Sequence, residues 1–142
     1  MKATMLLCDY AEAINGKLYI IGGGWSVTGP DPNPSAIAIR IEVPWDEANK
    51  QHKLQLELLT DDGQPVKVQT ITGEMPMAIG GNFEVGRPPG LKPGTPLDVA
   101  VAMNIGPIPL PPGRSFVWRL SINGEPNEDW GLTFSTRQQK QS

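Results

Sequence analysis

The stretch SFVWRLSINGE, residues 115–125, decides the fold class of this chain. Every second position in it is apolar, namely Phe116, Trp118, Leu120 and Ile122. A period of two places these side chains on one face of a β-strand. The Asn-Gly pair that follows supplies the positive φ angles of a two-residue hairpin turn. The stretch therefore predicts a strand with one face in a core and an antiparallel partner after the turn.

The same alternation recurs along the chain, in residues 37–43, 54–58, 97–105 and 130–134. Turn residues separate these rows, because Asn15-Gly16, Asn123-Gly124 and Asp61-Asp62-Gly63 all favour tight turns. In the row 97–105 the second face carries only small or polar side chains: Asp98, Ala100, Ala102 and Asn104. This pattern predicts that another segment packs closely over that face.

The first apolar segment, residues 3–10, differs because both of its faces are apolar. Met5 and Leu7 occupy one face, and Leu6 and Cys8 occupy the other. Strands that are buried on both faces show continuous apolar runs. The segment therefore predicts a central strand, and a strand covered by a neighbouring subunit is the alternative.

Proline locates the longer connections. Most of the 15 prolines fall in residues 29–34, 86–96 and 106–113, and proline cannot donate to a sheet ladder. Short strands, such loops and the lack of a helical period predict an all-β chain. We expect a single-domain antiparallel β-sandwich, immunoglobulin-like or similar, with a β-barrel as the alternative. The domain is expected to span residues 1–136, followed by a flexible C-terminal tail at 137–142.

Composition narrows the classes of partner. The 142 residues include 12 Lys and Arg and carry a net charge of −3. The basic residues are scattered, which argues against nucleic acid as a partner. No segment has the roughly 20 apolar residues of a membrane helix, and residues 1–8 lack the apolar run of a signal peptide. We expect a cytoplasmic protein that binds no membrane, or a virion protein if a phage encodes it.

Few residues are available for catalysis. The chain has one histidine, His52, and one cysteine, Cys8. Cys8 lies in an apolar row, where a thiol is usually buried and inert, and His52 precedes a strand, where we expect a solvated ring. One residue of each kind supplies neither a credible nucleophile–base pair nor a closed zinc site. We therefore expect no enzyme activity, no catalytic residue, no metal and no cofactor. The acidic residues near positions 9, 61 and 125–129 are expected to be solvated turn and loop residues.

The four tryptophans fall into two classes. Trp118 and Trp130 belong to apolar rows and are predicted core residues. Trp25 and Trp45 lie at or beyond predicted strand ends, next to a glycine and a proline. A large ring in such a place covers the edge of a core or presents a flat binding face. Trp25 and Trp45 are therefore the candidate residues for binding a ligand or partner.

Three stretches together resemble a known family: MKATMLLCDYAEAINGKLYIIGGGWS at residues 1–26, HKLQLELLTDDGQPV at 52–66 and PPGRSFVWRLSINGE at 111–125. The family consists of short uncharacterised all-β proteins of bacteria, chiefly actinobacteria, and a link to their phages is left open. The resemblance spans nearly the whole chain. It implies no known activity, so it transfers no catalytic or binding residue.

Without a reactive cluster, the leading hypothesis is a non-enzymatic protein-interaction or structural module. Self-association or docking to a protein partner would be its use. One alternative is a phage or virion accessory protein, such as a decoration or tail protein. The other is a small-ligand or carbohydrate-binding module that uses Trp25 and Trp45.

Overall fold

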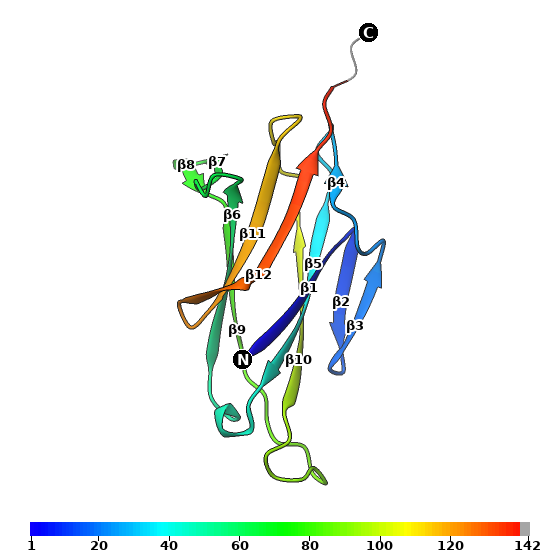
Figure 1. The fold of residues 1–142 in the computed structure, drawn as a ribbon, viewed down its shortest axis with the longest axis vertical. Coiled ribbons are helices and arrows are strands. Elements are labelled where there is room, and N and C mark those ends of the chain that lie inside the picture. Colours follow the sequence, from blue (N-terminus) through cyan, green and yellow to red (C-terminus); the bar gives the residue numbers. More distant parts are fainter. Residues whose placement is uncertain (140–142) are drawn as a thin grey trace.

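The computed structural model describes residues 1–139, and its main strands form two sheets that pack face to face (Figure 1). The first sheet has the order β1-β5-β10, with β1 at Lys2–Cys8, β5 at Ser35–Val43 and β10 at Leu97–Ile105. The second has the order β4-β12-β11-β6-β9, with these strands at Val27–Thr28, Glu125–Thr136, Ser115–Ile122, His52–Thr60 and Ala78–Phe83. Among the strands of residues 1–139, only β4 and β12 pair in parallel. The predicted all-β fold of packed antiparallel sheets is confirmed.

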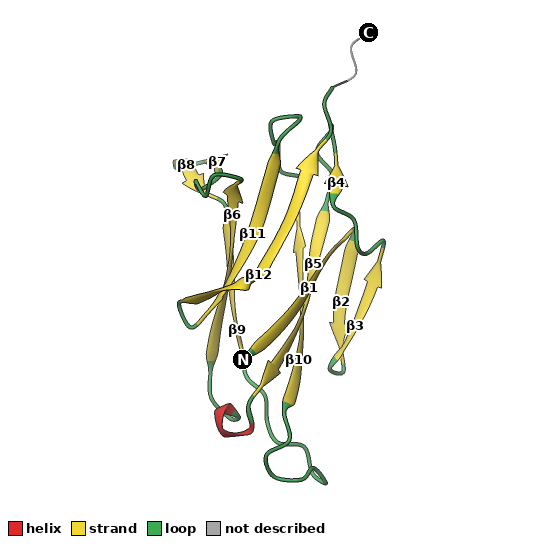
Figure 2. Cartoon of the chain, in the orientation of Figure 1, coloured by secondary structure: helices red, strands yellow, loops and turns green. Residues whose placement is uncertain are grey.

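Two hairpins and one short helix complete the described chain. β2 (Tyr10–Ile14) pairs with β3 (Lys17–Ile21), and β7 (Lys67–Thr70) pairs with β8 (Gly73–Pro76). The helix is the single 3-10 turn η1 at Trp45–Glu47, drawn red in Figure 2. No helix within residues 1–139 has the length and apolar character needed to cross a membrane.

The core lies between the two sheets and is filled by the alternating apolar rows. The first sheet contributes Leu7, Ile37, Ile39, Ile41, Val43 and Leu97, and the second contributes Leu54, Leu56, Leu58, Phe116, Trp118, Leu120, Ile122, Trp130 and Phe134. All of them are buried. The burial of apolar surface, at about 25 cal/mol per Å², is the main force that holds the two sheets together. The prediction that Trp118 and Trp130 are core residues is confirmed.

The β2–β3 hairpin forms a third layer over the outer face of the first sheet (Figure 1). Small side chains make this close approach possible. Ala36 and Ala38 of β5 and Ala102 of β10 are packed with Cys8 and with Ala11 of β2. The small residues on the second face of β10 predicted such a covering segment, and the structure confirms it.

β1 is an edge strand, so the prediction of a central strand is wrong. Within the described residues it pairs with β5 alone. Its second face is apolar because the hairpin that follows it in the chain covers Cys8 and approaches Leu6. A central position and a covering layer give the same apolar pattern, since each buries both faces of the strand.

Both predicted Asn-Gly turns are confirmed. Asn15 and Gly16 have φ angles of 51° and 73°, and Asn123 and Gly124 have φ angles of 53° and 82°. Two successive positive φ angles define the type I′ turn, whose twist matches that of the flanking strands. The turn chemistry therefore sets the register of the β2–β3 and β11–β12 hairpins.

The predicted tail, residues 137–142, starts with an anchored residue. The main-chain N–H of Arg137 donates to the Thr28 carbonyl at 2.9 Å, and its guanidinium donates to the Gly29 carbonyl at 2.9 Å. Residues 140–142 lie outside the described part of the chain.

Candidate interaction surface

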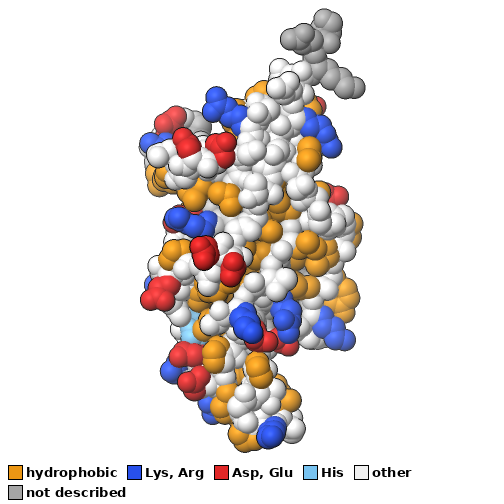
Figure 3. Space-filling model, in the orientation of Figure 1, with side chains coloured by type: hydrophobic (Ala, Val, Ile, Leu, Met, Phe, Trp, Pro, Cys, Tyr) orange, Lys and Arg blue, Asp and Glu red, His pale blue; other side chains and the backbone are white. Residues whose placement is uncertain are grey.

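The outward face of the β2–β3 hairpin carries four large apolar side chains that remain exposed. Tyr10, Ile14, Tyr19 and Ile21 have exposed fractions of 43, 45, 52 and 64%. Figure 3 shows hydrophobic side chains gathered on the side of the molecule where Figure 1 places this hairpin. These four residues are called the hairpin surface below. A contiguous group of exposed apolar residues, unlike single ones, is typical of an interaction site.

Strand register makes the hairpin surface continuous. Tyr10 lies directly opposite Ile21, and Tyr19 lies two positions before Ile21 on the same face. Ile14 occupies that face at the turn end of β2. Residues directly opposite each other have Cβ atoms about 4.5–5.5 Å apart, and diagonal neighbours are within reach of aromatic rings. The four side chains therefore form one apolar face.

Two charged residues lie on the same face. Glu12 is opposite Tyr19, and Lys17 is opposite Ile14. The Tyr10 hydroxyl donates a hydrogen bond to the Glu12 carboxylate. This hydrogen bond raises the pKa of Tyr10, because an ionised phenol would lose it and would face a negative charge. The face thus combines apolar side chains and two tyrosines with one charge of each sign.

One side chain binds the outer edge of β2 at Ala11. The Asn104 amide of β10 donates to the Ala11 carbonyl at 2.8 Å and accepts from the Ala11 N–H at 3.4 Å. These bonds tie the hairpin to the first sheet. They also show that both Ala11 main-chain groups point away from β3, so Ala11 and its partner Ile20 form a non-hydrogen-bonded pair.

The outer edge of β3 is open. Hydrogen-bonded and non-hydrogen-bonded pairs alternate in an antiparallel ladder, so Leu18 and Ile20 turn their N–H and C=O groups away from β2. Within residues 1–139 no strand pairs with this side of β3, and no hydrogen bond uses these four groups. The β3 sequence KLYII has a lysine only at its first position and no proline. Proteins use such residues to block exposed edges, and an edge that lacks them can accept a further strand.

The thiol of Cys8 lies under the hairpin. Its side chain has no exposed surface, and its Sγ is 3.5 Å from the Ala36 carbonyl oxygen. Burial, followed by the neighbouring charge of Asp9, raises the pKa of the thiol. A neutral, covered thiol is unreactive, as the sequence predicted, so alkylation of Cys8 requires the hairpin to detach.

Asn104→Ala is expected to loosen the hairpin while the sandwich stays folded. The variant removes two hydrogen bonds from Ala11, which lowers the stability of the attached state by about 1–2 kcal/mol, equivalent to a roughly 5- to 30-fold larger detached population. The rate of Cys8 alkylation should rise by the same factor. Asn82→Ala, at an exposed position in β9, is the matched control and should leave the rate unchanged. Equal rates in the two variants would show that Asn104 does not hold the hairpin.

Trp25, the first candidate residue from the sequence, closes one end of the core. Its ring packs edge-to-face on Phe134, with the centroids 6.0 Å apart and an interplanar angle of 82°. Its indole N–H is buried and has no hydrogen-bond partner in the described chain. The ring lines a cavity of about 40 Å³, which residues 28–33 and the side of the proline loop at Gly106, Ile108 and Leu110 also border. This volume suits a water molecule rather than a sugar ring.

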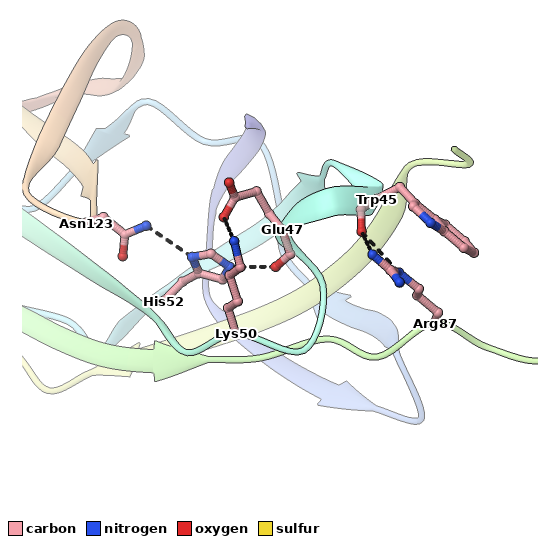
Figure 4. Close-up of polar contacts among 6 residues, drawn as sticks. All are labelled: Trp45, Glu47, Lys50, His52, Arg87 and Asn123. Atoms are coloured by element: carbon pink, nitrogen blue, oxygen red, sulfur yellow. Dashed lines mark hydrogen bonds and ion pairs between the residues drawn. The ribbon is translucent and has the colours of Figure 1, made fainter. Parts of the chain in front are cut away.

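Trp45, the second candidate, lies in η1 at the opposite end of the sandwich (Figures 1 and 2). The guanidinium of Arg87 stacks over the ring at 4.7 Å, and its Nε and Nη2 donate to the Trp45 carbonyl at 3.2 and 2.8 Å (Figure 4). An open groove of about 530 Å³ beside the ring shares no lining residue with the Trp25 cavity. The structure therefore does not bring the two tryptophans together into one site.

His52 is buried, so the prediction of a solvated ring is wrong. Only 3% of the residue is exposed. Its Nε2 lies 2.9 Å from the Glu47 carbonyl oxygen, its Nδ1 lies 3.1 Å from Asn123 Nδ2, and its ring stacks on Phe83 (Figure 4). The Asn123 side-chain oxygen accepts the Lys53 N–H at 3.0 Å, so the amide nitrogen faces the ring and Nε2 carries the proton. His52 joins η1 to the β11–β12 turn, which is a structural role.

The acidic residues do not converge on one site. The Thr60 hydroxyl donates to the Asp62 carboxylate, and this hydrogen bond lowers the pKa of Asp62. It closes the turn after β6. Within residues 1–139, no group of three or more Asp, Glu, His or Cys side chains is placed to hold a metal ion.

The hairpin surface was not among the residues that sequence reasoning singled out. The available signal is the segment KLYII, which has apolar residues on both faces of a strand next to an Asn-Gly turn. A two-stranded hairpin has only one face that its own domain can cover. The apolar residues on both faces of KLYII therefore indicate that one apolar face of the hairpin stays exposed.

A family model described as a family of unknown function (DUF6941) matches residues 3–135 of the chain. No curated protein and no solved structure matches it. The match includes the sandwich, the hairpin surface and the open β3 edge, and it agrees with the expected resemblance to an uncharacterised family.

Proposed function

We propose that this chain, which belongs to a family of unknown function (DUF6941), is a non-enzymatic protein-interaction module that binds through the hairpin surface. The observation that carries the proposal is the exposed apolar face of Tyr10, Ile14, Tyr19 and Ile21. Tyrosine is enriched at protein interfaces, where it buries a large area at a small cost in conformational entropy.

The way the hairpin is held supports the same proposal. The Asn104 amide and the alanines beneath β2 fasten the hairpin to the sandwich. A surface that is ordered before binding loses little conformational entropy when a partner docks. The open β3 edge adds main-chain donors and acceptors, which an extended partner strand uses in β-augmentation. Self-association and docking to another protein would both use this surface.

The other sequence-based hypotheses have less support. Trp25 and Trp45 lie at opposite ends of the sandwich and each packs against the core, so they do not form a shared stacking platform for a carbohydrate. A decoration or tail protein of a virion would itself be an interaction module. The proposed location is the cytoplasm, or the virion if a phage encodes the chain.

A comparative capture experiment tests the proposed function. Tyr19→Lys combined with Ile21→Lys places two charges on the hairpin surface, and the matched control, Ile71→Lys, changes a fully exposed residue at the β7–β8 turn. We expect wild type and control to retain the same partner proteins or copies of the chain from an extract of the source organism. The hairpin variant should retain less than about one tenth as much, as expected for loss of central interface residues. Equal retention by all three proteins would contradict the proposal.

A further inference from the structure

From the open edge of the hairpin we infer that β3 pairs antiparallel with β3 of a second copy, centred on Tyr19, to form a closed dimer. The inference rests on the proposed function and names the partner of the open β3 edge beside the hairpin surface. The dimer joins the two-stranded hairpins of both copies into one four-stranded sheet.

The register follows from which main-chain groups are free. Leu18 and Ile20 each present an N–H and a C=O at the edge of β3. When Leu18 lies opposite Ile20 of the second copy, all these groups form hydrogen-bonded pairs, and Tyr19 lies opposite its own counterpart. A register centred on Leu18 would pair Ile20 with Gly16 of the second copy, and a register centred on Ile20 would pair Leu18 with Gly22. Both glycines lie outside β3, with φ angles of 73° and 63°. Only the register centred on Tyr19 gives the N–H and C=O groups of Leu18 and Ile20 hydrogen-bond partners that lie within β3.

The side chains on the shared face fit this register. Tyr19 meets its counterpart in a non-hydrogen-bonded pair, where side chains come closest and aromatic pairs are favourable. Lys17 lies opposite Ile21 of the second copy, next to Gly22. The Asp9 carboxylate packs against Gly22 of its own chain. Lys17 of one copy and Asp9 of the other therefore lie at the same end of the paired strands, which places opposite rather than like charges there.

The assembly closes at two copies. Both copies use the β3 edge, so the same surface meets itself around a two-fold axis, as in most homodimers. The opposite edge of the hairpin, at β2, is already bound by the Asn104 amide. The Asn104 side chain therefore obstructs the pairing of a further strand along β2 at Ala11.

Disulfide trapping tests the register. In Tyr19→Cys the introduced thiols lie directly opposite each other, with Cβ atoms about 4.5–5.5 Å apart, close to the span of a disulfide. We expect mild oxidation to convert most of this variant into a covalent dimer. Lys17→Cys should dimerise poorly alone but should cross-link when mixed with Ile21→Cys. Ile71→Cys is the exposed control, and the native thiol of Cys8 is buried and does not compete.

Light scattering during size-exclusion chromatography tests the dimer itself. Wild type and Ile71→Lys should elute as dimers that dissociate on dilution, and Tyr19→Lys should weaken the dimer more than tenfold because two like charges meet at the two-fold axis. A wild-type monomer up to about 1 mM, or trapping at position 19 no faster than at position 71, would overturn the inference. Preferred trapping of Lys17→Cys with itself would overturn the register. Hairpin-dependent capture of a different protein would still support the proposed function, so the two failures are distinguishable.

Discussion

Trp118→Ala is expected to remove a large fraction of the protein's stability. Trp118 lies in the middle of β11, between Leu58 of β6 and Leu132 of β12 in the strand register, and is 2% exposed. Truncating a buried tryptophan costs about 3–5 kcal/mol, because apolar contacts are lost and a cavity remains. A domain of this kind has a total stability of only about 5–15 kcal/mol. Thermal unfolding followed by circular dichroism should show a Tm lower by roughly 10–20 °C.

Two variants serve as controls for Trp118→Ala. Trp118→Phe retains an aromatic ring and should lose less than half as much stability. Trp45→Ala removes a half-buried ring at the edge of the core, so its Tm should fall by only a few degrees. A Trp118→Ala protein that is as stable as Trp45→Ala would contradict the placement of Trp118 at the centre of the sandwich.

His52→Ala is expected to have the second-largest effect, a loss of about 2–4 kcal/mol in the free energy of unfolding. The variant leaves the Glu47 carbonyl and the Asn123 amide nitrogen without their partner and removes the ring stacked on Phe83. Each buried polar group that loses its partner costs about 1–3 kcal/mol. Urea denaturation measures the change. A solvated ring would instead give a change within about 0.5 kcal/mol.

A double-mutant cycle separates the contribution of the His52–Asn123 hydrogen bond. Asn123→Ala also removes the bond to the Lys53 N–H and places a residue other than Asn or Gly at a φ of 53°, so it is destabilising by itself. The double variant should be less destabilised than the sum of the single variants by about 0.5 kcal/mol or more. Strict additivity would show that ring and amide act independently.

Local sequence patterns predicted the faces of the strands and the positions of the turns. The period of two in residues 115–122 and the Asn123-Gly124 pair are short-range features, and each determines a local geometry. Strand order depends on pairings between distant segments, such as β1 with β5 and β5 with β10. The apolar pattern of β1 was compatible with two positions in a sheet, and only the location of the covering hairpin distinguishes them.

The candidate site was harder to predict for a related reason. The rings of Trp25 and Trp45 drew attention because of their size and their neighbours, but the exposure of a ring depends on which segments fold over it. Phe134 and Arg87, which contact these rings, are far away in the sequence. The buried position of His52 similarly depends on Asn123, 71 residues further along the chain.

The covering hairpin is complete long before the sheet that it covers. It ends at Ile21, whereas β10, which supplies Asn104 and part of the underlying face, ends at Ile105. At about 5–20 residues per second, ribosomal synthesis of the intervening chain takes roughly 4–17 s. A hairpin of this kind forms in about 1–10 μs. For several seconds the nascent chain therefore lacks the sheet that covers the inner apolar face of this hairpin, and both faces of the segment are exposed during that time.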